Sequence, residues 1–308
     1  MPDLVCLGEP LLEFSAVARD GETVYLQGYG GDTSNCAIAA ARQGASVGYV
    51  TAVGDDAFGR EFLDLWRREG IAVGAVTVDP HAPTGLYFIT YQDGQHEFSY
   101  RRAGSAASRM RPDTLSLEVI REARILHVSG ISQAISDSAC DAVFTAIATA
   151  REAGTQVSYD TNLRLKLWPL ARARAVIHAA MAEADIALPG LEDARQLTGL
   201  DAPDAIVDFY LKLGPKVVAL TMGAAGTLVA TTELRETVPV QKVEQVDATA
   251  AGDTFDGAFL ARLLAGDSVV GAARYANTAA ALSTQGYGAV APMPTSEAVQ
   301  QALAGTAP

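Results

Sequence analysis

Two kinds of segment alternate along this chain, and their order predicts its fold. Short apolar runs rich in β-branched residues are typical of buried strands, and amphipathic or alanine-rich runs that end at glycine are typical of helices. The predicted strands cover residues 4–7, 46–53, 123–130, 155–160, 185–189, 216–223 and 227–231. The predicted helices cover residues 33–44, 55–70, 136–154, 168–183, 191–198, 202–213 and the run after 253. This alternation predicts an α/β fold, a mostly parallel sheet with helices on both faces.

One region departs from this alternation. Residues 84–102 hold two strand-like runs around "QDGQ", and an Asp-Gly pair is typical of a hairpin turn. Together with the β-prone residues 22–29, they predict a small antiparallel sheet beside the main domain, drawn from about 12–30 and 84–103. A lid over a ligand and an ordinary edge hairpin are both compatible with this pattern.

The composition limits the class of protein. A chain of 308 residues that is 49% hydrophobic can bury a large core, and we expect a single domain over residues 1–308. Its 23 basic and 36 acidic residues give a net charge of −13, which argues against nucleic acid or an anionic membrane as the main partner. An anionic small molecule stays compatible with this charge if a few arginines converge.

The cysteines and the N-terminus indicate the compartment. Cys6, Cys36 and Cys140 are odd in number, widely spaced and set among apolar or small residues, which predicts buried thiols in a reducing compartment. The first residues lack the basic start and apolar core of a signal peptide, and no segment reaches the ~20 apolar residues of a membrane span. We therefore expect a cytoplasmic protein.

The stretch "VDATAAGDTFDGAF" at 246–259 places three small residues before Asp253 and a helical run. One interpretation is a helix N-cap, in which the aspartate accepts hydrogen bonds from the free N–H groups. The other is an anion site, in which bare N–H groups meet a phosphate while the carboxylate takes a proton from an attacking hydroxyl. The stretch alone leaves both open.

Polar and glycine residues also follow two predicted strands, where ligands gather in doubly wound sheets. Asp160, Asn162 and Arg164 follow residues 155–160 and suit a polyol or a phosphate. Gly223 and Gly226 stand at and just after the end of the predicted strand 216–223 and leave backbone accessible to a nucleotide. Each set also has a structural interpretation, a capping aspartate with a surface arginine or a simple β-turn.

Taken together, these segments resemble the ribokinase-like sugar kinases, the PfkB family, over nearly the whole chain. The segment "GGDTSNCAIAAARQGASVGYVTAVGDDAFG" is similar to the family's first signature, and "DATAAGDTFDGAF" is similar to its second. The resemblance implies a three-layer α/β/α domain with a central, mostly parallel sheet and a small β-sheet lid. It also implies phosphoryl transfer from ATP to a sugar, with Mg²⁺.

By this resemblance Asp253 is the catalytic base, and the N–H groups of Ala250, Ala251, Gly252 and Asp253 form the anion hole for the transferred phosphoryl group. The chain departs from the family at position 250, where most members have glycine. Alanine disfavours positive φ, so either the turn avoids that region or the hole is slightly altered. Its N–H is retained, and we expect activity to persist.

Within the family, "GEPLLEF", "YRRAGSAAS", "GISQAISD" and "TNLRLKLW" are most similar to 2-keto-3-deoxygluconate kinases. A sugar acid needs cationic donors that a neutral sugar does not. The residues implied to contact the acceptor are Gly31, Asn35, Tyr87, Tyr100, Arg102, Arg164 and Asp253. For the two tyrosines, half-buried strand positions are the alternative.

Two alternatives to this function stay open. The first is a kinase of the same fold for fructose, ribose or the galactonate epimer of the keto-deoxy acid. The second is a non-catalytic sugar-acid sensor, against which the retained Asp253 argues.

The resemblance also implies a nucleotide site. Its candidate residues are Asp160, Asn162, Thr221, Gly223, Gly226, Gly252 and Asn277. The metal position is less well matched, because relatives carry Asn-x-x-Glu where this chain has Gly190 and Asp193. Asp193 is the candidate to hold hydrated Mg²⁺ through water. Asp247 and Thr249 are candidates to flank a monovalent cation.

The lid strand "LYFITY" presents large apolar or aromatic groups on both faces, with Leu86, Phe88 and Thr90 on one and Tyr87, Ile89 and Tyr91 on the other. A hairpin alone cannot bury both. We expect one face to cover the sugar and the other to pair with a second copy of the chain, giving a dimer through the lid.

Overall fold

A computed structural model describes residues 1–19, 21–92 and 95–305 of the chain. The predicted Asp-Gly turn at 93–94 lies outside these ranges. For Tyr91 the structure describes the backbone but not the side chain, so the face predicted for it is not tested.

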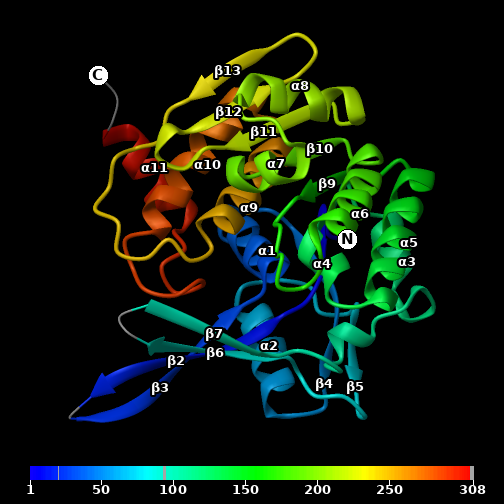
Figure 1. Cartoon of the computed structure of the whole chain (residues 1–308), viewed down its shortest axis with the longest axis vertical. Coiled ribbons are helices and arrows are strands. Elements are labelled where there is room, and N and C mark those ends of the chain that lie inside the picture. The colour runs from blue at the N-terminus through cyan, green and yellow to red at the C-terminus, as the bar shows by residue number, and fades with distance from the viewer. Residues whose placement is uncertain (20, 93–94, 306–308) are drawn as a thin grey trace.

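A nine-stranded sheet forms the centre of the molecule (Figure 1). In spatial order its strands are β13 (Arg235–Val238), β12 (Thr227–Ala230), β11 (Val217–Thr221), β10 (Ile186–Leu188), β9 (Gln156–Asp160), β8 (Ile125–Ser129), β1 (Leu4–Leu7), β4 (Val47–Gly54) and β5 (Val76–Asp79). All neighbours are parallel except β11 with β12 and β12 with β13. The predicted mostly parallel sheet is confirmed, with β5 and β13 as strands that the pattern did not predict.

Helices cover both faces of this sheet. One face is covered by α3 (Leu117–Arg121), α4 (Gly130–Ala134), α5 (Asp137–Ala153), α6 (Leu170–Ala182), α7 (Leu191–Thr198) and α8 (Pro203–Leu213). The other is covered by α1 (Asp32–Arg42), α2 (Ala57–Arg68), α9 (Ala251–Leu264), α10 (Val269–Ser283) and α11 (Ser296–Gly305). The described residues also include three short 3₁₀ turns, η1 (Ala107–Arg109), η2 (Pro112–Thr114) and η3 (Gly223–Ala225).

Strand β1 shows why the apolar runs are continuous. All four of its residues are fully buried; Leu4 and Cys6 pack into the cluster with α1 and α9, while Val5 and Leu7 pack into the cluster with α5 and α6. Alternate side chains of a strand point to opposite faces, so a strand covered on both sides is apolar at every position. The three-layer α/β/α architecture is confirmed.

The small sheet has four strands in the order β3 (Glu22–Gly30), β2 (Leu11–Arg19), β6 (Leu86–Gln92) and β7 (Gln95–Arg101). Pairs β2–β3 and β6–β7 are antiparallel, but β2 and β6 run parallel, which the hairpin pattern did not predict. In Figure 1 this sheet projects from the main domain at the lower left, below α1 and beside α2.

One face of the small sheet is partly covered by helix α2. Phe14 packs edge-on against Phe58 with ring centroids 5.9 Å apart, and Tyr29 packs in the same way on Phe62 at 5.5 Å. The hydroxyl of Tyr29 also donates to Glu61 at 2.8 Å. We predicted that a second copy of the chain covers this face of the small sheet. That prediction is wrong for the part around Phe14 and Tyr29, because α2 already covers it.

Two further expectations concern buried thiols and membrane-spanning segments. Cys6, Cys36 and Cys140 are all buried free thiols, as predicted. Within the described ranges, no helix is both long and apolar enough to cross a membrane.

Candidate active site

A cavity of about 850 Å³ lies between the small sheet and the loops at the carboxyl ends of β1 and β9. All of the residues predicted to contact the acceptor line it, together with Asn162: Gly31, Asn35, Tyr87, Tyr100, Arg102, Asn162, Arg164 and Asp253. The fold thus brings these positions together, while their individual roles stay predictions.

We distinguish two sides of this cavity. The floor is formed by the first turn of α1, the loop 162–164 after β9, and the start of α9, from which Thr249 and Asp253 line the cavity. The sheet wall is formed by Glu9, Tyr87, Phe98, Tyr100 and Arg102.

Gly31 sets the approach of α1 to the floor. Its φ is 105°, and a Cβ at this position would lie 2.3 Å from the carbonyl oxygen of Glu9. Neither the backbone conformation nor the space admits a side chain, so glycine is required. The turn delivers Asn35 to the cavity, where its Nδ2 donates to Oδ2 of Asp253 at 2.8 Å.

The start of α9 is an uncapped helix terminus. Ala250, in the N-cap position, has φ 58° and ψ 18° and offers no side-chain cap. The turn thus does not avoid positive φ, which was one of the two predicted possibilities. Among the described residues, the N–H groups of Gly252 and Asp253 have no acceptor, whereas that of Ala251 donates to Ala248 at 3.2 Å. Unpaired N–H groups at a helix start favour an anion.

Asp253 has the titration expected of a general base. Desolvation and the negative charge of Asp32 raise the pKa of this carboxyl to about 7, against the lowering effects of Asn35 and Arg164. The side chain keeps an opening to the cavity although protein surrounds it on its other sides. When the pKa of a base lies near the working pH, a large fraction of the base is deprotonated, and it still binds a proton strongly enough to take one from the substrate.

The loop after β9 is held by two aspartates. Oδ1 of Asp160 accepts from the N–H of Asn162 at 3.1 Å, and Oδ2 of Asp193 accepts from the N–H of Leu163 at 2.8 Å. Asn162 has φ 29°, and it and Ala250 are the two non-glycine residues with positive φ in the described ranges. Burial, with the charges of Asp253 and Asp32, raises the pKa of Asp160 well above its usual range. Strained backbone of this kind gathers at functional sites.

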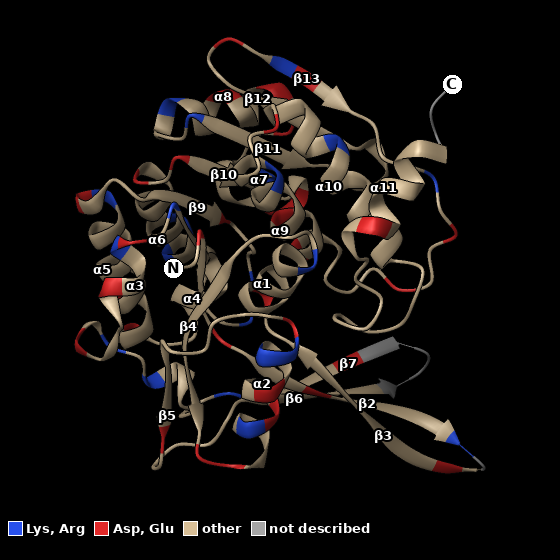
Figure 2. Cartoon of the chain, turned by 180° about the vertical axis from the view of Figure 1, so that it is seen from behind, with Lys and Arg blue, Asp and Glu red and all other residues tan. Residues whose placement is uncertain are grey.

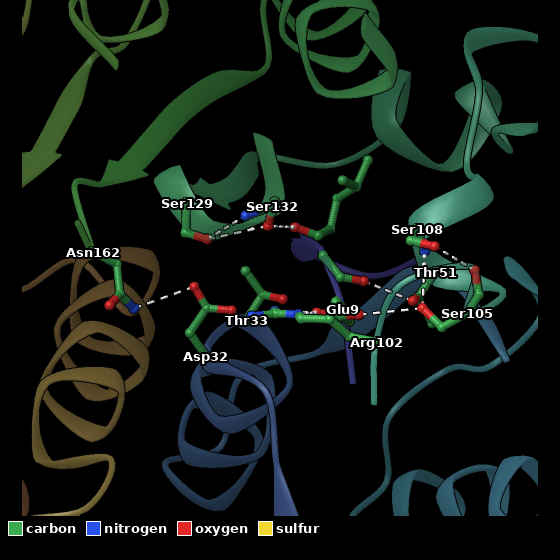
Figure 3. Close-up of polar contacts among 12 residues, drawn as sticks. Glu9, Asp32, Thr33, Thr51, Arg102, Ser105, Ser108, Ser129, Ser132 and Asn162 are labelled. Carbon is green, nitrogen blue, oxygen red and sulfur yellow. Dashed lines mark hydrogen bonds and ion pairs between the residues drawn. The ribbon is translucent and has the colours of Figure 1, made fainter. Parts of the chain in front are cut away.

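The sheet wall contains a buried ion pair. Nε of Arg102 donates to Oε2 of Glu9 at 2.8 Å, and Nη2 also contacts this oxygen, as Figure 3 shows. The side chain of Glu9 is fully buried and that of Arg102 is 12% exposed. Burial raises the pKa of Glu9 in spite of Arg102. Arg102 thus lines the cavity with its charge already neutralised.

Aromatic rings cover the rest of the sheet wall. Tyr87 and Tyr100 are stacked with centroids 5.6 Å apart, and the guanidinium of Arg102 lies 5.3 Å from the centroid of Tyr100. The hydroxyl of Tyr87 donates to Glu13, which is itself only 5% exposed. This pairing fixes Tyr87 against the cavity.

Of the predicted nucleotide residues, Asn162 lines the cavity, whereas six lie outside its lining: Asp160, Thr221, Gly223, Gly226, Gly252 and Asn277. Thr221 ends β11 and bridges to Gly190, and Gly223 and Gly226 both have positive φ. The amide of Asn277 accepts from Thr227 at 2.7 Å and donates to the carbonyl of Val238 at 3.0 Å.

The predicted cation positions are both engaged by backbone. Oδ2 of Asp193 accepts the hydrogen bond from the N–H of Leu163 in the loop after β9. Asp247 accepts from the N–H and hydroxyl of Thr249, at 2.9 and 2.7 Å, and from the N–H of Gly288 at 2.9 Å. The described residues include no cluster of three or more His, Cys, Asp or Glu side chains placed to hold a metal.

Glu9, Asp32, Phe98 and Lys166 also line the cavity, and the sequence did not single them out. Phe98 could have been found, because it alternates with Tyr100 on the same strand. Glu9 and Asp32 lie inside quoted motifs, but nothing in their local pattern distinguishes a cavity carboxylate from a turn residue.

Comparisons with known proteins agree with this geometry. The family model described as pfkB family carbohydrate kinase matches residues 1–296. The chain is 34% identical to fructokinase-1 of Zea mays over 314 residues, covering 97% of each chain. It is 35% identical to 2-dehydro-3-deoxygluconokinase of Thermoproteus tenax over 275 residues, covering 86% of this chain and 83% of the relative. The structure of a fructokinase with bound ATP from Xylella fastidiosa superposes with a TM-score of 0.89 at 26% identity, covering 99% of each chain.

Proposed function

This chain belongs to the pfkB family of carbohydrate kinases, and from that premise we propose that it phosphorylates the 6-hydroxyl of 2-keto-3-deoxygluconate with ATP. The product is 2-keto-3-deoxy-6-phosphogluconate. The observation that carries the chemistry is Asp253, a carboxylate with a pKa of about 7 at an uncapped helix start that faces the cavity.

The floor supplies the groups for this transfer. Asp253 takes the proton of the acceptor hydroxyl, whose oxygen forms a bond to the terminal phosphorus while the bond from that phosphorus to the ADP oxygen breaks. ADP leaves with the electron pair. The N–H groups of Gly252 and Asp253 stabilise the charge on the transferred group, because they are fixed dipoles without protein acceptors. A sensor without turnover has no need of such a base.

Mg²⁺ fits the site as an ion that arrives with the nucleotide. One oxygen of Asp193 is committed to the N–H of Leu163, which leaves the other for a water of the hydrated ion. Mg²⁺ in phosphoryl-transfer sites keeps several waters and uses one or two carboxylates besides phosphate oxygens. Thr221, Gly223, Gly226 and Asn277 stay our candidates for the nucleotide side, with Asp247 and Thr249 for a monovalent cation.

Two arginines support a sugar acid as acceptor. Arg164 lines the floor, and its charge lowers the pKa of Asp253, so we assign it to the reacting end and the transferred phosphoryl group. Arg102 lies on the sheet wall, and its Nη1 is the nitrogen that Glu9 does not engage. We assign this nitrogen to the carboxylate of the acceptor.

Fructose is the second candidate, and one observation favours it. Because Glu9 neutralises the charge of Arg102, the sheet wall attracts a substrate carboxylate less strongly than an unpaired arginine would, and a neutral sugar does not need that charge. The fructokinase of Zea mays is as similar to this chain as the 2-dehydro-3-deoxygluconokinase of Thermoproteus tenax.

A coupled assay of ADP release tests the proposal. With MgATP, we expect kcat/KM for 2-keto-3-deoxygluconate to exceed that for its galactonate epimer, fructose and ribose by at least about tenfold. A higher kcat/KM for fructose would identify fructose as the acceptor and leave the proposed phosphoryl transfer from ATP unchanged. ADP release that no acceptor stimulates would contradict both.

We further propose that the small sheet pairs with the same sheet of a second copy. Tyr25 and Leu26 are 49% and 54% exposed near its outer end, and Figure 2 shows few charged residues along β2 and β3 before their tips. Tyr25 packs edge-on against Phe88 and so lies on the face of the sheet that does not cover the cavity. Tyr25→Glu should convert a dimer to a monomer in light scattering, whereas the control Leu234→Glu, at a 36% exposed position on another surface, should not. A wild-type monomer at micromolar concentration would contradict this assembly.

A further inference from the structure

A second cavity lies apart from the candidate active site, beside the edge strand β5 of the central sheet (Figure 1). Its volume is about 340 Å³, and none of the described residues lines both cavities. It is bounded by residues 50–52 of β4, by β5 and by the chain segment 106–115, which contains η1 and η2. A cavity of this size is at the small end of those that hold ligands.

The base of the second cavity is apolar. Val50, Ala52, Ala106 and Met110 line it, and these side chains are between 1% and 7% exposed. All four belong to the buried cluster on the α5 side of the sheet, so they form a packed surface rather than a mobile one. Such a base favours a ligand with an apolar body.

Arg109 is a charged group at the rim of this cavity without an acidic partner. Among the described residues its guanidinium makes one hydrogen bond, from Nη1 to the carbonyl oxygen of His81 at 3.3 Å, and no ion pair. Arg111, two positions on, donates instead to both oxygens of Asp113, at 3.0 and 3.2 Å. A guanidinium that has no carboxylate partner can bind an anion through two parallel hydrogen bonds.

Asp79 limits the charge of that anion. This carboxylate also lines the second cavity, where its Oδ1 accepts from the N–H of His81 at 2.7 Å. Because Arg109 and Asp79 line the same small cavity, a second negative charge on the ligand would be repelled by the aspartate and would find no further unpaired arginine. A monocarboxylate therefore fits this charge balance better than a phosphate dianion.

The second cavity also borders both connections of the hairpin β6–β7 to the main domain. The chain passes beside it from β5 to β6 and again from β7 to η1. The N–H of Ala106 donates to the carbonyl of Pro83 at 2.9 Å and so joins the two connections. The hydroxyl of Ser105 in turn contacts Glu9 of the sheet wall at 3.3 Å, as Figure 3 shows. A ligand on Arg109 therefore acts on the segments that position the sheet wall.

We propose that the second cavity is a regulatory site for a small monocarboxylate with an apolar body, whose carboxylate binds Arg109. The bound ligand holds the two connections in one arrangement, and the sheet wall then loses less freedom when the acceptor binds. The two ligands consequently strengthen each other's binding by the same factor. The site itself is independent of the proposed kinase function, whereas its effect on the acceptor rests on that function.

Benzoate is the first probe, with benzamide as an uncharged ligand of nearly the same shape. We expect titrations followed by NMR to give a Kd for benzoate that is ~10–100-fold lower than that for benzamide, the value of a charge-assisted hydrogen bond. Arg109→Gln should weaken benzoate binding by a similar factor. The control Arg111→Gln removes an arginine that is already paired with Asp113 and should change this Kd less than about twofold.

The regulatory effect is measured on the acceptor. At saturating benzoate, the Kd of 2-keto-3-deoxygluconate or of fructose from calorimetry should fall by about fivefold or more in the wild type. In Arg109→Gln, with a thermal melt to verify folding, benzoate should leave the acceptor Kd unchanged. Without benzoate, this variant should phosphorylate the acceptor like the wild type, because Arg109 does not line the first cavity.

Four results would contradict this inference. Benzoate binding that Arg109→Gln leaves unchanged would overturn the site. Equal binding of benzoate and benzamide, or tighter binding of inorganic phosphate, would overturn the class of ligand. An acceptor Kd that bound benzoate does not lower would overturn the regulatory role. A wild-type protein that phosphorylates no acceptor would overturn the proposed function instead, and the benzoate titrations, which need no turnover, would still decide the site.

Discussion

The floor and the sheet wall of the cavity face each other but differ in how their polar groups are satisfied. On the floor, one oxygen of Asp32 and the N–H groups of Gly252 and Asp253 have no partner in the described part of the chain, and Ala250 and Asn162 have positive φ. On the sheet wall, the corresponding groups are already paired within the protein, Glu9 with Arg102 and Glu13 with Tyr87.

This difference separates two tasks. Groups without protein partners are available to substrate and to charge that develops during the reaction, at some expense of stability. Paired groups hold a surface in a fixed shape, and removing one partner leaves the other buried and unsatisfied. Substitutions on the floor should therefore change activity most, and substitutions on the sheet wall should change stability most.

The largest effect is expected for Asp253→Asn. Removing a general base lowers the rate ~10²–10⁴-fold, and this base also orients the acceptor, so we expect kcat to fall toward the upper end of that range. The same variant should melt at a higher temperature at pH 8, because it removes a buried charge whose pKa is raised to about 7. Near wild-type kcat would contradict the assigned role.

The next effect concerns the ion pair of the sheet wall. Arg102→Met leaves the fully buried Glu9 without its partner and should lower the free energy of unfolding by ~3 kcal/mol at pH 8. The loss should be smaller at pH 5, because the pKa of Glu9 is raised and the carboxyl can take up a proton.

A double variant serves as the control for this pair. Adding Glu9→Gln to Arg102→Met should restore part of the lost stability, as urea unfolding would measure. If Arg102→Met left stability unchanged while abolishing turnover, the distinction between floor and sheet wall would fail.

The third prediction concerns pH. The native state holds a proton on Asp253 up to about pH 7, while the unfolded chain releases it near pH 4, so stability should fall as pH rises between these values. At 1.36 kcal/mol per pKa unit, discounted for the opening to the cavity, this amounts to ~2–4 kcal/mol. Urea unfolding of the wild type and Asp253→Asn at pH 4 and pH 8 measures it as the difference between the two proteins. In the active enzyme, kcat/KM should rise with pH and level off above about 7.

The smallest effect is expected at Ala250. Its φ of 58° is unfavourable for alanine, so Ala250→Gly should stabilise the protein by ~1 kcal/mol and change kcat less than about threefold, since the N–H is kept. Ala251→Gly is the matched control, because Ala251 is the first residue of α9 itself and glycine there should destabilise by ~0.5–1 kcal/mol. Equal effects at the two positions would show that the αL backbone is not strained.

Local pattern was enough for much of the fold. The apolar run of β1 and the glycine-ended helices follow from short-range preferences, and the structure confirms both. The start of α9, which the stretch alone left open between an N-cap and an anion site, has no side-chain cap. Strands β5 and β13 were missed because each has four residues, half or more of them exposed or half-exposed, without a continuous apolar run. The resemblance to sugar kinases added the residues expected to contact the acceptor, all of which line the cavity, but it did not single out Glu9, Asp32, Phe98 and Lys166.

The sequence by itself determined which residue types stand at the ends of the strands, but the tertiary structure decided which of them are paired. Glu9 and Arg102 are 93 positions apart, Asp32 and Asn162 are 130 apart, and Asn35 and Asp253 are 218 apart. Propensities and periodicity act over a few residues, whereas these contacts depend on how the layers pack and where the small sheet meets the main domain. For the same reason, Arg102 in the sequence is a free cation and in the structure is half of an ion pair, while Asp32 changes from an unremarked turn residue to an acceptor without a donor.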